Sequence, residues 1–277
     1  MKKLYYLLVF LFVSAGLLAQ IAPDRFGYIN TPEIIANKGF QLELGQDYNT
    51  LDYNTLFVRS ATNICFRQGL SKIHEVRISL PELYAEDIYL DQKYGYMSVG
   101  VKIKVANYEK LKIASIGTFG IELQSFLDIN RPNSYLQLNV PIEYKFTDKT
   151  SLLAEAFFNV EAYNYKLNEI SNLSIGLKQR IGKNITLIPA SVSRIQLTHR
   201  GDHGKKPEWN QVHYASFGLL GFIGENVRLD FGVMKPWLTG KGQDKPDVGL
   251  VFKAGLSVLM NHLPFDKNKV KISKEIH

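Results

Sequence analysis

The clearest pattern in the sequence is an alternation of apolar and polar residues with a period of two. Between residues 135 and 164 it runs along two arms, with apolar side chains from Leu136 to Phe146 and again from Leu152 to Val160. Polar or charged residues such as Glu143 and Glu155 occupy most of the positions between, and residues 147–149 make a short turn. Two arms of about ten residues, each with one apolar and one polar face, are typical of a hairpin in a membrane barrel.

The same alternation recurs along the chain and predicts twelve strands in all. The other ten cover residues 40–48, 55–67, 75–80, 96–105, 112–126, 173–181, 185–197, 212–222, 227–237 and 247–259. Gly182 and Gly224 lie at two of the short junctions, where tight hairpins need a positive φ. Longer polar connections fall at residues 82–94, 198–210 and 238–246. Alternating short and long connections predict short turns and both termini in the periplasm, and long loops outside the cell.

The predicted fold is therefore all-β: a transmembrane antiparallel up-and-down β-barrel of about twelve strands over residues 38–260. A soluble β-sandwich or a lipocalin-like barrel would also alternate, with the apolar face turned inward. Period two alone does not say which face is the core. The number of strands and the breadth of their apolar faces favour the membrane barrel. Aromatic residues near strand ends, among them Tyr96, Tyr135, Tyr144 and Phe146, fit the girdles at the membrane surfaces.

The two ends of the chain differ from the barrel in composition. Residues 1–19, with Lys2 and Lys3 before an apolar run, predict a cleaved secretory signal, and residues 20–37 a periplasmic lead. Residues 261–277 form a basic tail that we expect in the periplasm. Signal and tail supply most of the net charge of +7, so the barrel itself gives no reason to expect a nucleic-acid partner. We expect export to the outer membrane, where the partners are membrane lipid, lipopolysaccharide and the barrel-assembly machinery.

Past the signal, no run of eighteen apolar residues occurs, which argues against a helical membrane protein. Cys65 is the only cysteine, so no intramolecular disulfide can form, and we expect it on the lumen face.

Charged residues on the polar faces are the candidate functional residues, because they line the lumen of a barrel with this orientation. The predicted lumen-lining residues are Glu43, Arg59, Arg67, Glu75, Arg77, Lys102, Lys104, Glu122, Glu143, Lys145, Glu155, Glu161, Lys178, Arg180, Arg228, Asp230 and Lys253. Twelve strands leave at most a narrow passage, so these charges will largely pair with each other. Two interpretations stay open: a narrow pore with a weak anion bias, or a plugged barrel whose charges hold the wall together.

Several short motifs resemble a known family. Lys38-Gly39-Phe40-Gln41-Leu42-Glu43-Leu44-Gly45, then residues 66–77, 146–152, 221–230 and 246–250, resemble the phenol-degradation meta-pathway family of outer-membrane barrels. The sequence departs from that family's pattern at Ser71-Lys72-Ile73-His74 and in its basic tail without a terminal aromatic residue. The resemblance implies an outer-membrane channel or transporter for a small organic molecule, and it transfers no catalytic residue.

Other chemistry is weaker. His199, Asp202 and His203 could approach a metal, and Glu82, Glu86, Asp87 and Asp91 could take calcium, but solvated loops explain both groups better. We therefore expect no metal and no cofactor. A lipid hydrolase at the barrel rim would need a serine activated by a histidine, but His213 and Ser216 are three residues apart, on opposite faces of a strand. The sequence favours a non-enzymatic channel, with a hydrolase or a structural or adhesive barrel as alternatives.

Overall fold

The computed structural model describes residues 29–51, 57–80, 83–86, 93–122, 134–163, 166–199, 208–224, 226–239 and 248–260. The strands are β1 (Phe40–Leu51), β2 (Phe57–Gly69), β3 (His74–Ser79), β4 (Leu83–Glu86), β5 (Lys93–Tyr94), β6 (Tyr96–Asn107), β7 (Leu111–Glu122), β8 (Ser134–Lys145), β9 (Thr150–Tyr163), β10 (Lys166–Arg180), β11 (Ile185–His199), β12 (Glu208–Ile223), β13 (Val227–Thr239) and β14 (Val248–Met260). No helix in this described part of the chain is long and apolar enough to cross a membrane.

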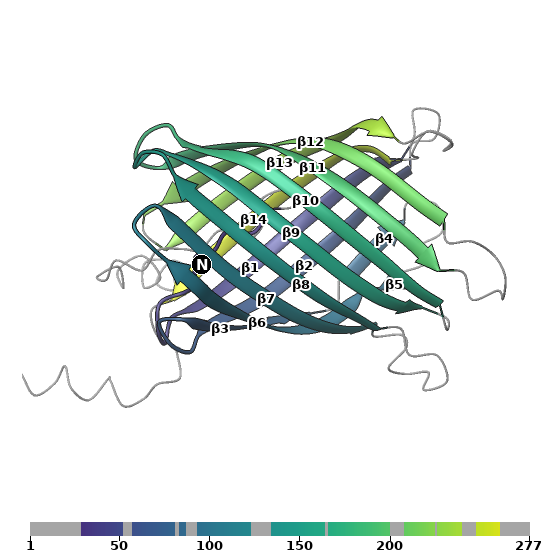
Figure 1. Ribbon diagram of the computed structural model, residues 1–277, viewed down its shortest axis with the longest axis horizontal. Coiled ribbons are helices and arrows are strands. Elements are labelled where there is room, and N and C mark those ends of the chain that lie inside the picture. Colours follow the sequence, from purple (N-terminus) through teal and green to yellow (C-terminus); the bar gives the residue numbers. More distant parts are fainter. Residues whose placement is uncertain are drawn as a thin grey trace, which may run out of the picture.

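All these segments belong to one antiparallel sheet that closes on itself (Figure 1). The closing contact pairs β1 with β14, in a register that sets Phe40 opposite Met260. The short segments β3 and β4 both pair with β2, and they form one interrupted wall strand. Next to it, β5 pairs with β4 and β6 pairs with β3, so β5 and β6 form a second interrupted strand around Gly95. The described segments therefore build the predicted barrel of twelve antiparallel strands.

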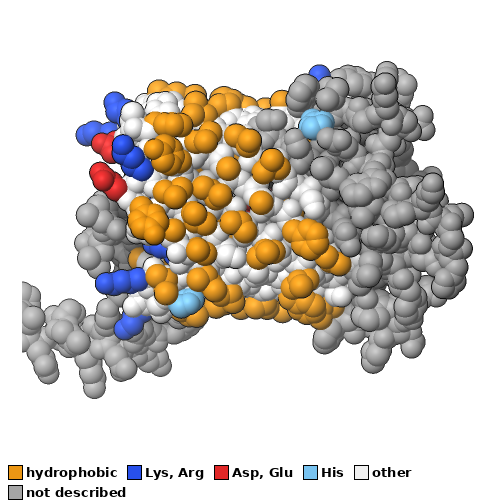
Figure 2. Space-filling model, viewed as in Figure 1, with side chains coloured by type: hydrophobic (Ala, Val, Ile, Leu, Met, Phe, Trp, Pro, Cys, Tyr) orange, Lys and Arg blue, Asp and Glu red, His pale blue; other side chains and the backbone are white. Residues whose placement is uncertain are grey.

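The apolar faces of the strands point outward, and the polar faces point inward. Along β6, Val99, Val101 and Ile103 are exposed on the outer surface, whereas Lys102 between them is fully buried. Along β8, Leu136 is 63% exposed on the outside. Figure 2 shows hydrophobic side chains spread over the wall, with charged side chains at the end that carries the short turns. A soluble barrel would have the opposite arrangement, so this alternative from the sequence is wrong and the outside of the wall is suited to hydrocarbon.

The short turns have the backbone conformation that their residues predict. Gly182 and Gly224 adopt positive φ values of 132° and 66°. Such values cost glycine little because it has no Cβ. The β8–β9 turn is closed by a hydrogen bond in which Phe146 N donates to Thr150 O at 3.0 Å.

The wall extends further than the alternation predicts. β10 begins at Lys166 rather than at residue 173, and the predicted loop at residues 82–94 contains the strands β4 and β5. Beyond the hydrocarbon layer a strand keeps its backbone hydrogen bonds but no longer needs an apolar outer face, which explains why the period-two signal stops early. Two aromatic residues also differ from the expected girdle: Tyr96 and Tyr135 lie on inward-facing positions and meet edge to face at 5.1 Å.

The described part of the predicted periplasmic lead lies against the inside of the barrel. We call residues 29–39 the N-terminal segment. Ile29, Thr31 and Ile35 in it are buried, with exposures of 2%, 0% and 1%. The segment is therefore part of the folded lumen.

Candidate functional site: the charged lumen and its N-terminal segment

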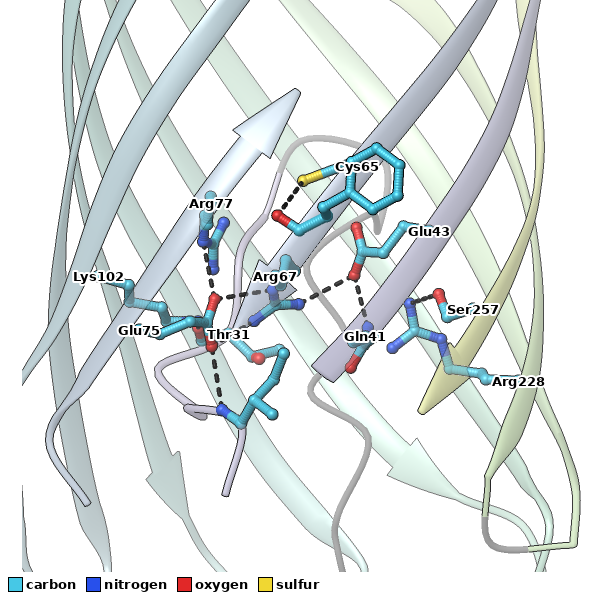
Figure 3. A network of polar contacts seen from close by, with 12 residues as sticks. Thr31, Gln41, Glu43, Cys65, Arg67, Glu75, Arg77, Lys102, Arg228 and Ser257 are labelled. Carbon is cyan, nitrogen blue, oxygen red and sulfur yellow. Dashed lines mark hydrogen bonds and ion pairs between the residues drawn. The ribbon is translucent and has the colours of Figure 1, made fainter. Parts of the chain in front are cut away.

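A network of charged side chains lines the lumen where β1, β2 and β3 run side by side (Figure 3). Arg67 of β2 is fully buried, and its Nε and one terminal nitrogen donate to the two carboxylate oxygens of Glu75 at 2.7 and 2.9 Å. Its other terminal nitrogen donates to Glu43 of β1 at 2.9 Å. Arg77 adds a second cation to Glu75 at 2.9 Å, and Gln41 donates to Glu43 at 2.6 Å. The planar guanidinium thus joins three neighbouring strands.

This network stabilises the wall. Each carboxylate accepts several short charge-assisted hydrogen bonds, as buried ions require. Loss of one partner from such a buried pair is strongly destabilising, by about 3–5 kcal/mol, because the remaining charge is uncompensated. Arg67, Glu43 and Glu75 are therefore positioned by register and held rigidly.

The N-terminal segment is held to the inner wall at four points by hydrogen bonds. The backbone N and the side-chain amide of Asn30 both donate to Glu155 of β9 at 2.6 Å. Lys102 of β6 donates to the carbonyl oxygen of Thr31 at 2.6 Å. The backbone N of Ile35 donates to Glu75 at 3.0 Å.

The fourth point lies where the segment leads into β1. The backbone N of Lys38 donates to Gly69 O at 2.8 Å, and Gly69 N donates to Gly39 O at 3.0 Å. Lys38 has a positive φ of 65°, in a turn closed by the bond from Gly39 N to Ala36 O. Lysine takes this conformation at a cost of about 1–3 kcal/mol when the surroundings impose it. The close approach also requires a glycine at position 69, because an added Cβ would overlap the backbone of the segment.

Apolar contacts complete the docking of the segment. Ile29 packs with Leu153, Ile188 and Leu220, which point inward from β9, β11 and β12. Gly176 leaves room for it, since a Cβ there would come within 3.0 Å of the Ile29 side chain.

Ile35 packs with Leu259 of β14 and with Phe222 of β12. Inward-facing apolar side chains of β9, β11, β12 and β14 therefore share the lumen with the charged residues.

Glu33 projects from the middle of the segment toward lysines of the inner wall. Its Oε1 lies 3.4 Å from Lys112 Nζ of β7 and 4.0 Å from Lys178 Nζ of β10. Lys178 also pairs with Glu143 of β8 at 3.1 Å. Burial disfavours the ionised carboxylate, but the ammonium groups around it, led by Lys178 and Lys112, outweigh this and hold the pKa of Glu33 below its usual value.

The other predicted lumen residues divide between buried pairs and the two rims. Arg228 is buried beside Ser257 and Asp230, at 3.1 and 3.5 Å, and Lys253 pairs with Asp47 at 3.1 Å. Lys253 is half-buried, as are Lys104, Glu122, Lys145 and Glu161. Arg180 is exposed, because it is the last residue of β10, at the short turn to β11. Arg59 lies on β2, but its side chain is outside the described residues.

Lys112, Asp47, Asn30 and Glu33 are among the residues with roles in the lumen that were not predicted. Lys112 and Asp47 share the inward positions of their strands, so the period-two pattern could have found them. Asn30 and Glu33 lie in a segment without periodicity, and no signal in the sequence points to their place. Cys65 is on the inward face of β2, with Sγ 3.8 Å from the Phe66 carbonyl oxygen.

The remaining candidates do not form a reactive site among the described residues. No group of three or more His, Cys, Asp or Glu residues there could hold a metal ion. Asp202, His203, Glu82, Asp87 and Asp91 lie outside the described residues, as do the side chains of His199 and Glu86. Ser216 occupies an inward position of β12 and donates to the Ala190 carbonyl at 3.5 Å, whereas His213 occupies an outward position.

Comparisons with known proteins concern the fold. No protein-family model matches the chain, and no curated protein matches it significantly. The structure of an outer membrane channel from Pseudomonas putida F1 has a TM-score of 0.63 and 7% identity, over 87% of this chain and 100% of that chain. The NanC porin has a TM-score of 0.55 and 10% identity, over 78% of this chain and 98% of its own. The KdgM porin in complex with disordered oligogalacturonate has a TM-score of 0.50 and 6% identity, over 79% and 98%.

Proposed function

We propose that this protein is an outer-membrane channel that binds and passes a small organic solute. The observation that carries the proposal is the closed wall, whose apolar side chains face outward while Arg67, Lys102 and Glu155 are buried inside. A wall of this kind is stable in a bilayer and encloses a polar path. The solved channels and porins of the same fold support this proposal. In this function the protein sits in outer-membrane lipid and lipopolysaccharide, is inserted by the barrel-assembly machinery, and performs no catalysis.

The family suggested by the sequence fits this function. Its motif at residues 38–45 falls on the start of β1, and the motif at residues 66–77 spans the β2–β3 turn and the Arg67–Glu75 pair. These motifs therefore coincide with the part of the wall against which the N-terminal segment docks. We propose membership of the phenol-degradation meta-pathway group on this basis.

The passage is narrow. A barrel of about eight strands is filled by its own side chains, whereas about sixteen leave an aqueous channel, so twelve strands lie between these cases. The N-terminal segment occupies part of the periplasmic half of this lumen, next to Glu75 and Lys102. We therefore expect low conductance in the docked state.

Reconstitution separates the channel from its alternatives. The purified protein should migrate differently on a detergent gel before and after boiling, and liposomes that contain it should release small organic solutes. A plugged structural or adhesive barrel, favoured by the docked segment, predicts no release even from a variant that lacks residues 29–36. Absence of solute release and of conductance steps in both proteins would refute the channel. A phospholipase assay on the same preparation tests the rim hydrolase.

A further inference from the structure

We propose that the Glu33 carboxylate occupies the place of the solute's own carboxylate, and that the lumen binds a small organic acid with an apolar body. This inference rests on the channel function proposed above, and it assigns the class of solute.

Lysines from three strands surround the middle of the N-terminal segment. Lys112 and Lys178 face the Glu33 carboxylate at 3.4 and 4.0 Å, and Lys102 holds the neighbouring Thr31 carbonyl at 2.6 Å. Glu143 also pairs with Lys178, at 3.1 Å, and Glu75, which is bound by Arg67 and Arg77, is the cross-strand neighbour of Lys102. Without Glu33 this part of the lumen would hold an excess of buried positive charge, which is unfavourable until an anion neutralises it.

The geometry distinguishes the contacts of Glu33 with the lysines from the wall network around Arg67. Arg67 binds Glu75 through two nitrogens at 2.7 and 2.9 Å, whereas the Glu33 contacts are longer and come from flexible lysine side chains. Lysine acts as a mobile point charge, and arginine imposes a fixed planar geometry. The lysines can therefore accept another carboxylate without disturbing the wall, which the Arg67 pair could not do.

The apolar side chains that pack against the segment fit an apolar body. Leu153, Ile188 and Leu220 are each at most 2% exposed because Ile29 covers them, and Leu259 is covered by Ile35. When the segment moves aside, these side chains face the lumen beside the lysines, since Leu153 is the cross-strand neighbour of Glu143, which pairs with Lys178. A cation cluster next to an apolar patch suits a molecule with one carboxylate and a compact hydrocarbon part. A phosphate ester of a sugar would leave the apolar patch uncovered.

Displacement requires the segment to lose the contacts that hold it to the wall. The strained backbone where the segment joins β1 lowers the cost of this change. The segment is fastened to Glu155 at Asn30, and it turns at the strained Lys38 before β1. Relaxation of the turn releases the strain energy of Lys38, and this offsets part of the free energy lost with the contacts.

The test compares benzoate with its neutral isostere benzamide, because the two differ mainly in charge. Binding to the full-length protein in detergent is measured by isothermal titration calorimetry. Glu33→Gln removes the internal competitor, so benzoate should bind about tenfold more tightly while benzamide affinity stays within about twofold. Glu109→Gln is the matched control, since Glu109 lies exposed in the β6–β7 turn, and it should change neither affinity. Adding Lys112→Met to Glu33→Gln should remove the benzoate gain.

Two further results complete the test. In the wild-type protein, saturating benzoate should increase hydrogen exchange in residues 29–35, whereas benzamide should not; this measurement needs no variant. Equal gains for both solutes in Glu33→Gln would show that the segment is only a steric plug, and no gain for benzoate would also overturn the inference. Release of solutes from liposomes without any preference for benzoate refutes the inference alone, and no release at all refutes the channel.

Discussion

Gly69→Ala is the sharpest test of how the N-terminal segment docks. A Cβ on Gly69 would lie 2.5 Å from the carbonyl oxygen of Ile35, and it would overlap the carbonyl of Ala36 as well. Both are backbone atoms, so no side-chain rotation relieves the contact. Overpacking of this kind costs about 1–3 kcal/mol. Moving the segment away also weakens the two backbone hydrogen bonds that Gly69 makes with Lys38 and Gly39, at about 0.5–1.5 kcal/mol each.

The lower end of these values, about 2 kcal/mol in total, already raises the undocked population about thirtyfold, since 1.4 kcal/mol corresponds to a factor of ten. A cysteine at position 31 reports this population, because Thr31 is fully buried in the docked segment. Cys65 must be replaced by serine first, since it is the only native cysteine. The rate of maleimide labelling of Thr31→Cys should then rise about thirtyfold in the Gly69→Ala background.

Gly117→Ala provides the matched control. Gly117 is exposed on the wall, and a Cβ there meets nothing within 4 Å. Labelling should stay at the parent rate in this variant. Equal labelling rates in Gly69→Ala and Gly117→Ala would refute the idea that the close approach at Gly69 controls docking.

Three other predictions concern the wall and the charge of the lumen. Arg67→Met should lower the free energy of unfolding in urea by about 3–5 kcal/mol, because it leaves Glu43 and Glu75 short of a cation; Arg180→Met at the exposed strand end should change it little. The pKa of Glu33 is lowered from 4.5, so its contribution to docking is complete above that pH and is lost as the pH falls through the lower folded value. Labelling of residue 31 should therefore become faster at acid pH, and this acceleration should be smaller in Glu33→Gln; an identical pH profile in the two proteins would contradict this. Val101→Arg on the outer face should destabilise the barrel in lipid by about 2–4 kcal/mol, whereas Tyr108→Arg, 70% exposed at the turn, should be tolerated; equal effects in vesicle unfolding would contradict the membrane-facing surface.

The wall could be predicted from the sequence because its two sides face different surroundings. Lipid outside and charge inside force Val99, Val101 and Ile103 to alternate with Gly100 and Lys102, and this alternation is visible without a structure. Tyr96 and Tyr135 show the limit of the approach, since aromatic residues near strand ends occur on both faces. Tyr96 shares the parity of Lys102 on β6 and Tyr135 that of Asn139 on β8, so both point inward.

The contents of the lumen could not be predicted in the same way. The partners of Arg67 come from strands on either side of β2, and the register that aligns them is set by turns and by closure of the barrel. Glu33 meets Lys112 and Lys178 from 79 and 145 positions away along the chain, without any local pattern. Predicting such contacts requires the cross-strand register and the path of the N-terminal segment.

The covalent connection between the N-terminal segment and β1 has a quantitative consequence. The segment joins β1 directly at Gly39 and Phe40, so its local concentration at its docking place is fixed and independent of how much protein is present. Short tethers give effective concentrations in the millimolar range or above. Any dissolved molecule that binds at the same place competes with this effective concentration. The weaker its affinity, the higher its own concentration must be, so occupancy begins only above a threshold concentration in the medium. Lengthening the tether lowers that threshold.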